Sequence, residues 1–203
     1  MMIRKTTMEK WSNRLFGLTF FGWAFANLFV TEDAASIVRI CIAALHVTAG
    51  TLILFRSPVK NHGTIQSMIG CIPGIVSAGL VFRLAGSTDQ WPSVWIILFG
   101  LATVWSILSL LTLGDSFAVF PSLRSIKQRG PYAVVRHPAY LGEIGMIVCC
   151  AAVAHTYLAW PALALAIATI VIRILIEEKL LVTMDGYRDY QSSVPYRLIP
   201  RLW

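Results

Sequence analysis

Residues 158–177 read LAWPALALAIATIVIRILIE, an apolar run that charge interrupts only near its end, at Arg173 and Glu177. A helix needs about 20 mostly apolar residues to cross the hydrocarbon core of a bilayer. The run therefore predicts a membrane-spanning helix that carries ionisable side chains close to one of its two ends.

Apolar runs of similar length occur along the chain before this one. Of the 203 residues, 57% are hydrophobic and 13% are charged, whereas about a quarter of the residues in a soluble domain are charged. We therefore expect an all-α, multi-pass transmembrane protein of about six spans. The first five cover residues 15–31, 36–55, 66–85, 93–113 and 139–155. Only a few residues around His155 and Pro161 separate the last two, which predicts an antiparallel hairpin.

Basic residues indicate the orientation of these spans. The net charge is +7, and nearly all Lys and Arg residues lie in the N-terminal tail, the 56–65 loop, the 114–138 loop and the C-terminal tail. Cytoplasmic segments of membrane proteins collect Lys and Arg, so both termini and these two loops are predicted to face the cytoplasm. The basic start resembles a signal peptide. No clear small-x-small cleavage site follows it, so an uncleaved first span is expected.

The composition also argues against other classes of protein. The basic residues are not interleaved with exposed aromatic residues, so no nucleic-acid partner is expected. The cysteines lie in apolar runs without metal-ligand spacing, which predicts small buried side chains and neither a metal site nor a disulfide framework, at Cys41, Cys71, Cys149 and Cys150. An integral membrane location is expected, in the inner membrane if the source is bacterial.

The first polar cluster is the stretch RGPYAVVRHPAYLGE at residues 129–143. Gly130-Pro131 predicts a turn, and Pro138 suits the first turn of a helix, where its missing N–H costs nothing. Backbone N–H groups at such a helix start can bind an anion or a ligand carboxylate. Arg136 and His137 lie beside that start, and the alternative interpretation makes them interfacial anchors that face lipid head groups.

The second cluster consists of Arg173, Glu177 and Glu178 near the end of the last span. Arg173 and Glu177 are four residues apart, so they share a helix face and can pair. Ionisable residues at membrane depth usually face a cavity or a partner. In an antiparallel hairpin, Glu143 and Arg173 would lie at similar depth, roughly 6–7 Å inside the boundary, which predicts a contact or a shared polar pocket. The alternative is a snorkelling helix end with the glutamates in water, which suits Glu178 best.

The third cluster comprises Tyr187, Tyr190 and the tail VPYRLIPRLW at residues 194–203. Tyrosines three residues apart suit one face of a short helix. The prolines prevent a continuous helix in the tail, which can fold back over the cytoplasmic mouth of the bundle. The alternative is an aromatic and basic anchor at the membrane interface.

Taken in order, the three clusters resemble the isoprenylcysteine carboxyl methyltransferase family and its bacterial relatives, which are also similar to the phospholipid N-methyltransferases. The resemblance covers the C-terminal half of the chain. The preceding segment Leu113-Gly114-Asp115-Ser116-Phe117 is similar as well. The matching motifs are Gly130-Pro131-Tyr132, Arg136-His137-Pro138-x-Tyr140-x-Gly142, Arg173-x-x-x-Glu177-Glu178-x-x-Leu181, Gly186-Tyr187-x-x-Tyr190 and Val194-Pro195-x-Arg197-x-Ile199-Pro200.

This resemblance implies a methyltransferase that uses S-adenosylmethionine bound at the cytoplasmic ends of the last helices. By position, His137 and its neighbouring backbone would hold the cofactor, and Glu177 and Glu178 would bind its polar groups. Arg173 would face the acceptor or its carboxylate. The remaining cofactor-binding motif residues would shape or close the pocket, with the two C-terminal tyrosines as its cover: Gly130, Pro131, Tyr132, Arg136, Pro138, Tyr140, Gly142, Tyr187 and Tyr190.

The identity of the methyl acceptor stays open in the sequence. A carboxylate or thiolate acceptor would need no base, whereas an amine would need its proton removed, for which Glu143 or Glu177 can serve. A lipophilic acceptor can reach the pocket sideways from the bilayer. On this view, residues 1–113 form a scaffold that gives the substrate access, and residues 114–203 form the catalytic, cofactor-binding part.

Two other functions remain alternatives at this point. The tail from Val194 to Pro200 also resembles the end of membrane sterol reductases, which use a nicotinamide cofactor. Those enzymes are usually longer and tend to carry Asn where Ala139 stands. A small transporter or membrane scaffold is the other alternative. Such proteins tend to place polar residues near the bilayer midplane between repeats, and no repeat is visible here.

Overall fold

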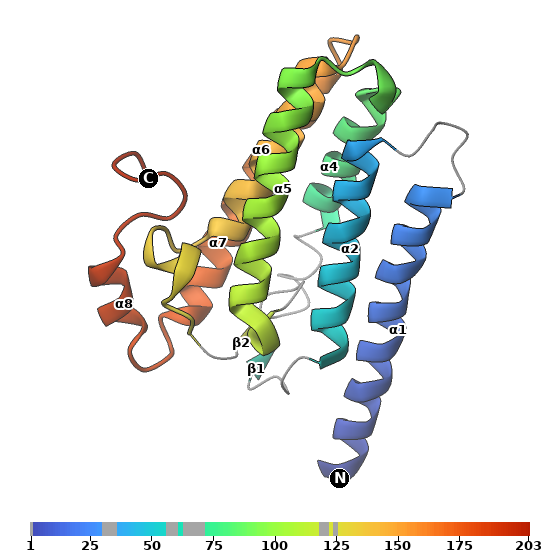
Figure 1. The fold of residues 1–203 in the computed structure, drawn as a ribbon. Helices are drawn as coiled ribbons and strands as arrows, with labels where there is room; N and C mark the ends of the chain where they lie inside the picture. The colour runs from blue at the N-terminus through green and yellow to red at the C-terminus, as the bar shows by residue number, and fades with distance from the viewer. Residues whose placement is uncertain (1, 30–35, 56–60, 63–71, 118–121, 124–125) are drawn as a thin grey trace.

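The computed structural model describes the chain except for residues 1, 30–35, 56–60, 63–71, 118–121 and 124–125. Helices dominate the described part, with short 3-10 turns between them (Figure 1). The long helices are α1 (Met2–Phe29), α2 (Ile37–Phe55), α4 (Ile72–Leu84), α5 (Ser93–Leu113), α6 (Pro138–Val153) and α7 (Ala159–Leu181). The shorter elements are η1 (Thr88–Gln90), η2 (Gly114–Ser116), η3 (Gly130–Ala133), α8 (Tyr187–Ser193), β1 (Asn61–His62) and β2 (Ser122–Leu123).

Each of the six apolar runs holds one long helix, but the ends differ from the prediction. The predicted last span ended at residue 177, whereas α7 continues to Leu181, so both glutamates lie within the helix. Residues 66–71 of the predicted third span and residues 30–31 of the first lie outside the described residues. Apolar content locates a helix well, but it does not mark where a helix leaves the bilayer.

Three described helices are long and apolar enough to cross a membrane, namely Ile37–Phe55, Ser93–Ser116 and Ala159–Leu181. Helix α6 is apolar but has 16 residues. It extends over roughly 24 Å, less than the ~30 Å of a typical hydrocarbon core. A helical protein with helices that can span a membrane is confirmed, while the count of six spans and the orientation stay predictions.

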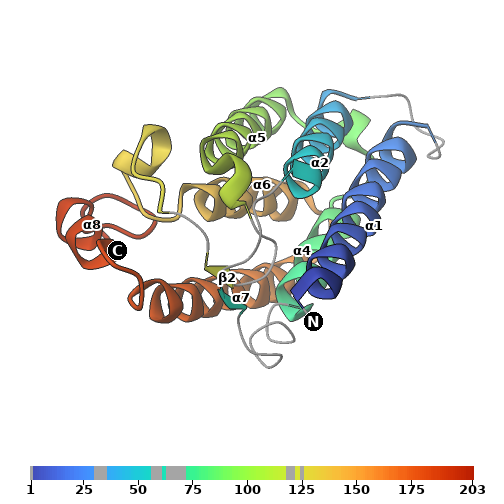
Figure 2. The same cartoon turned by 90° about the horizontal axis from the view of Figure 1, so that it is seen from below.

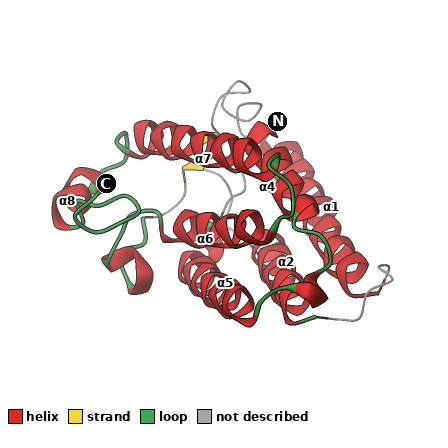
Figure 3. Ribbon diagram, turned by 90° about the horizontal axis from the view of Figure 1, so that it is seen from above, coloured by secondary structure: helices red, strands yellow, loops and turns green. Residues whose placement is uncertain are grey.

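The two end-on views show how the long helices are layered. Helices α1, α2 and α5 pack in sequence along one side, and α4 packs against α7 on the other (Figures 2 and 3). Helix α6 lies between α5 and α7 in both views. Helices α6 and α7 run antiparallel as expected, but α6 packs mainly against α5 and α7 mainly against α4.

Close packing between α5 and α6 fixes the start of α6. A Cβ placed on Gly142 would clash with Ser106 Oγ and would lie 2.8 Å from the Ala102 carbonyl oxygen. The Trp105 indole N–H donates a hydrogen bond of 3.0 Å to the Pro138 carbonyl. Helix α6 thus approaches α5 as closely as a glycine permits, and the first turn of α6 is held in place.

The short strands β1 and β2 pair antiparallel, with Asn61 opposite Leu123 and His62 opposite Ser122. This pairing joins the connection after α2 to the connection after α5. The two strands lie at one end of the bundle, the end at which α1 begins (Figure 1). The described strand residues of the two basic loops are thus brought to the same end.

Candidate active site

The Glu178 clamp, formed by Glu178, Arg136, His137 and Arg197, links the last span to the chain before α6 and to the tail. Glu178 Oε1 accepts a hydrogen bond of 2.8 Å from Arg136 Nε and lies 3.3 Å from His137 Nε2. Glu178 Oε2 accepts one of 2.8 Å from Arg197 Nε. The Glu178 and Arg136 side chains are only 6% and 5% exposed. The glutamate is buried and fully engaged, not a snorkelling group in water.

Backbone hydrogen bonds bind the tail to the same place. The Arg136 and His137 N–H groups donate to the Tyr196 and Arg197 carbonyls, each at 2.9 Å. Arg136 Nη1 also donates to the Val194 carbonyl at 2.7 Å. These two amides just before α6 are therefore used by the tail. The tail does fold back over this end of the last helices, as the sequence predicted.

A loop closes the tail on itself. The Arg197, Leu198 and Ile199 N–H groups all donate to the Trp203 carbonyl oxygen at 2.9–3.3 Å. The Arg197 guanidinium lies 5.1 Å from the centre of the Trp203 ring, which is a cation–π distance. The closed loop holds Arg197 in the position that meets Glu178.

The Tyr140 cluster, formed by Tyr140, Glu177, Arg173 and Glu143, lies beside the clamp. The Tyr140 hydroxyl donates a hydrogen bond of 2.5 Å to Glu177 Oε1. The Arg173 guanidinium lies 5.0 Å from the centre of the Tyr140 ring. The charges of Arg173 and Glu143 interact, so α6 and α7 bring these two residues into one polar region, as their predicted depth required.

His137 connects the clamp to the Tyr140 cluster. Its Nδ1 lies 4.0 Å from Glu177 Oε2, and its ring centre lies 5.9 Å from that of Tyr140. The Glu177 side chain is 21% exposed, far more than that of Glu178. Glu177 is therefore the more accessible of the two carboxylates.

Two tyrosines and Val194 form a small hydrophobic core under the tail. The rings of Tyr187 and Tyr190 pack edge to face with their centres 5.9 Å apart. The Tyr190 hydroxyl donates a hydrogen bond of 2.7 Å to the Tyr132 carbonyl. Burial raises the pKa of Tyr190 to about 12 and also raises the pKa values of Tyr132 and Tyr187, so all three phenols stay protonated. The position of Tyr187 and Tyr190 agrees with a cover, but their contact with a cofactor stays a prediction.

Gly130 and Pro131 shape the approach to the site as the turn that the sequence predicted. They begin η3, and Gly130 has φ +57°, a conformation that favours glycine. A Cβ at Gly130 would also lie 3.2 Å from Thr112 Oγ1 on α5. The turn therefore packs closely on α5 and delivers the buried Tyr132 to the tyrosine core.

The structure brings most of the predicted site residues into three adjoining groups, the Glu178 clamp, the Tyr140 cluster and the tyrosine core, whereas Gly130, Pro131, Pro138 and Gly142 lie outside them. Gly142 lies about one turn after Pro138, the first residue of α6, and faces α5. The sequence analysis did not assign a role to Arg197 or Trp105, which hold the tail and the start of α6. Arg197 lay within a recognised motif, whereas Trp105 lay inside an apolar run and carried no signal of its own.

Replacement of Tyr190 by Phe tests the tyrosine core. The Tyr190→Phe variant keeps the ring against Tyr187 but leaves the Tyr132 carbonyl without its hydrogen bond. We expect a loss of about 1 kcal/mol in the free energy of unfolding, measured by thermal unfolding in detergent. The matched control is Tyr157→Phe, because Tyr157 is 80% exposed. A loss no larger than that of the control would contradict the assigned hydrogen bond.

Fold and site together define a class of protein. It is a helical membrane protein with apolar helices of spanning length and a polar centre where the start of α6, the end of α7 and the C-terminal tail meet. Such a centre, partly exposed and rich in carboxylates and guanidinium groups, is typical of a catalytic or binding site and not of a plain membrane anchor.

The comparison with protein families makes this class specific. Residues 91–187 match the family described as phospholipid methyltransferase. Over this range the chain is similar to that family of membrane methyltransferases, to which the isoprenylcysteine-type enzymes are related, so the resemblance seen in the sequence is confirmed. A comparison with curated proteins gave no match. The matched range begins with the residues before α5, ahead of the predicted boundary at 113/114, and contains both the Tyr140 cluster and Glu178.

Proposed function

We propose that this protein transfers a methyl group from S-adenosylmethionine to a lipophilic acceptor at the Tyr140 cluster. The family indicates a membrane methyltransferase, and its members generally use S-adenosylmethionine. The observation that carries the proposal is the hydrogen bond from Tyr140 to Glu177, which fixes the position of a carboxylate whose side chain is 21% exposed.

The residues beside Glu177 fit this cofactor. When bound, S-adenosylmethionine supplies a methyl group on a positively charged sulfur, and displacement by the acceptor leaves a neutral thioether. Glu177 offers a carboxylate to the ammonium group or ribose hydroxyls. The Tyr187 hydroxyl is buried with no hydrogen-bond partner among the described residues, so it has unused capacity toward a ligand. The Glu178 carboxylate is occupied by protein cations, so we assign it the task of positioning His137 and the tail.

The other side of the Tyr140 ring suits the acceptor. Arg173 holds a guanidinium over that ring, where it can bind an acceptor carboxylate or orient a polar head. For an amine acceptor, Glu143 can remove the proton, because it lies in the same polar region. Methyl transfer is an in-line displacement, so alignment of the acceptor by Arg173 and Tyr140 contributes more than acid–base chemistry does. An isoprenylcysteine-type carboxylate, a thiol and a lipid amine are all compatible with this arrangement.

We place the site at the cytoplasmic face, with six spans and both termini inside. Two observations support this orientation. The β1–β2 pair joins the two basic loops at the end where α1 begins, and α8 lies toward the same end (Figure 1). Cytoplasmic segments carry the excess of Lys and Arg. S-adenosylmethionine can then reach the site from the cytoplasm, while the acceptor arrives from the bilayer.

Calorimetric binding of S-adenosylhomocysteine to the detergent-purified chain tests the proposal. We expect saturable binding that weakens by at least about tenfold in Glu177→Ala, equal to about 1.4 kcal/mol. Asp185→Ala is the matched control, since Asp185 is an exposed carboxylate just after α7 and touches none of the three groups. NADPH is titrated in parallel.

Each outcome of this titration decides between functions. Binding of S-adenosylhomocysteine that depends on Glu177 but not on Asp185 supports the methyltransferase site. Equal binding by wild type and Glu177→Ala contradicts the site. Binding of NADPH instead of S-adenosylhomocysteine supports a reductase, and binding of neither ligand supports a transporter or scaffold.

A further inference from the structure

A cavity lies at the opposite end of the bundle from the Glu178 clamp. Its volume is about 240 Å³, and it forms where α4 ends, α5 begins and α6 ends. His137 directly precedes the first residue of α6, and Val153, which lines the cavity, is the last residue of the same helix. The length of α6, roughly 24 Å, therefore separates the two sites. The residues that give the cavity its character are Ser87, Gln90, Trp91, Trp95, Val153 and His155.

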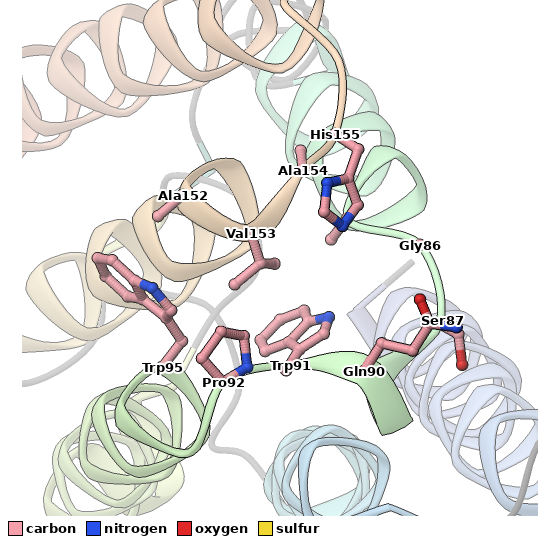
Figure 4. Close-up of a pocket in the computed structure, with 11 residues that line it drawn as sticks. Gly86, Ser87, Gln90, Trp91, Pro92, Trp95, Ala152, Val153, Ala154 and His155 are labelled. Carbon is pink, nitrogen blue, oxygen red and sulfur yellow. The ribbon is translucent and has the colours of Figure 1, made fainter.

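The Trp91 indole is the central feature of this cavity. Trp91 is only 5% exposed, and its Nε1–H has no hydrogen-bond partner among the described residues. Figure 4 shows the nitrogen edge of the indole turned toward the space between His155, Ser87 and Gln90. Buried tryptophan N–H groups usually find an acceptor, so this donor points to a ligand that accepts a hydrogen bond.

The surroundings of Trp91 favour a negatively charged acceptor. The indole can only donate, and the Ser87 hydroxyl, the Gln90 amide and the His155 ring can each donate as well. None of the described residues that line the cavity carries a carboxylate. The cavity also opens at the N-terminus of α5, a helix of 21 residues whose dipole favours an anion there.

The outer face of α5 indicates where such an anion comes from. Exposed apolar side chains follow one stripe of the helix from its first turn, at Val94, Ile97, Leu101 and Val104, which are 54–62% exposed. This spacing forms a continuous apolar track on one helix face. Trp95, which lines the cavity, lies on another face of α5, so a lipid whose head group occupies the cavity reaches this track around the first turn of the helix.

We propose that this cavity binds the phosphate group of a phospholipid, with Trp91 Nε1–H as its central donor. The site lies in the leaflet opposite the methyl-transfer centre and is independent of the proposed function. Its volume of about 240 Å³ suits one head-group phosphate and not a whole lipid, whose chains remain on the surface of α5.

Nuclear magnetic resonance of the ¹⁵N-indole-labelled full chain tests this site directly. The chain has seven tryptophans, and the Trp91 signal is identified by its loss in Trp91→Phe. The protein is held in a maltoside detergent, which contains no phosphate. It is titrated with dihexanoyl phosphatidylglycerol, with the dihexanoyl glyceride that lacks the phosphate, and with sodium phosphate. We expect the Trp91 Nε1–H signal to shift saturably with the phospholipid, and not with the glyceride.

A charge variant and an internal control make the outcome specific. Gln90→Glu places a carboxylate beside the cavity at an exposed position, and it should weaken phospholipid binding by about tenfold through repulsion of the phosphate. The Trp160 signal is the control, because Trp160 is 58% exposed at the same end and does not line the cavity.

The three titrations separate the sources of the phosphate. A saturable shift with sodium phosphate that matches the phospholipid supports a phosphate site filled from solution instead of from the bilayer. A Trp91 signal that moves equally with the glyceride, or with none of the three ligands, overturns the proposal. Equal phospholipid binding by wild type and Gln90→Glu overturns the anionic character of the site.

Discussion

Glu178→Gln should lower the free energy of unfolding by about 3–5 kcal/mol, the largest stability effect that we expect of any single substitution in this chain. The variant keeps the size of the side chain but removes the negative charge that meets Arg136, Arg197 and His137. Arg136 is buried, so it would retain an uncompensated positive charge. Thermal unfolding of the purified protein in detergent measures the loss.

The tail should be released along with the lost stability. Trypsin can cut after Arg197 and Arg201, and the closed tail protects the first of these bonds in the wild type. We expect cleavage at Arg197 to become much faster in Glu178→Gln. Glu177→Gln is the control for stability, since the amide oxygen can still accept the Tyr140 hydroxyl and the side chain is partly exposed. Similar unfolding curves for the two variants would show that the clamp does not hold the tail.

Gly142→Ala should cost about 1–3 kcal/mol of stability by forcing α5 and α6 apart. The added Cβ would meet Ser106 Oγ, which can turn away, and also the Ala102 carbonyl oxygen at 2.8 Å, which belongs to the backbone and cannot. The start of α6 would then shift relative to Trp105, so Tyr140 would move away from Glu177. We therefore expect weaker binding of S-adenosylhomocysteine together with the lower unfolding temperature.

Gly100→Ala supplies the matched control for this substitution. Gly100 lies in the interior of α5, and a Cβ there would find nothing within 4 Å. Alanine is the better helix former, so this variant should be neutral or more stable by up to about 1 kcal/mol. Adding Ser106→Gly to Gly142→Ala should restore part of the lost stability. No difference between Gly142→Ala and Gly100→Ala would refute the close approach of the helices.

The positions of the helices followed from the apolar runs alone, because length and hydrophobicity are sufficient to locate helices that face lipid. The motif around Gly130 and Pro138 also predicted its turn and its helix start. The ends of the spans could not be predicted from the apolar runs. Helix α7 continues four residues beyond its predicted end, since Glu177 and Glu178 find partners at the helix end and need not mark its exit into water.

The sequence could not predict that Glu177 and Glu178 have different partners and different exposure. Adjacent residues on a helix point about 100° apart. Only the positions of α6 and the tail decide which of the two glutamates meets Arg136, Arg197 and His137. Arg136 and Val194, which the clamp joins, are 58 residues apart along the chain. Spacing rules describe neighbours on one helix face. They therefore predicted an Arg173–Glu177 pair, but they could not predict that Tyr140 of α6 contacts both side chains.

The Glu178 clamp also has a consequence for biosynthesis. Arg136 is translated long before its partners in α7 and the tail, so the ribosome must complete residue 196 before all contacts of Arg136 can form. Until then, a cation destined for a buried position stays at the surface of the partly inserted chain. Helices α1, α2, α4 and α5 can assemble during translation, whereas the candidate active centre is completed only after the tail that follows α8 has been made.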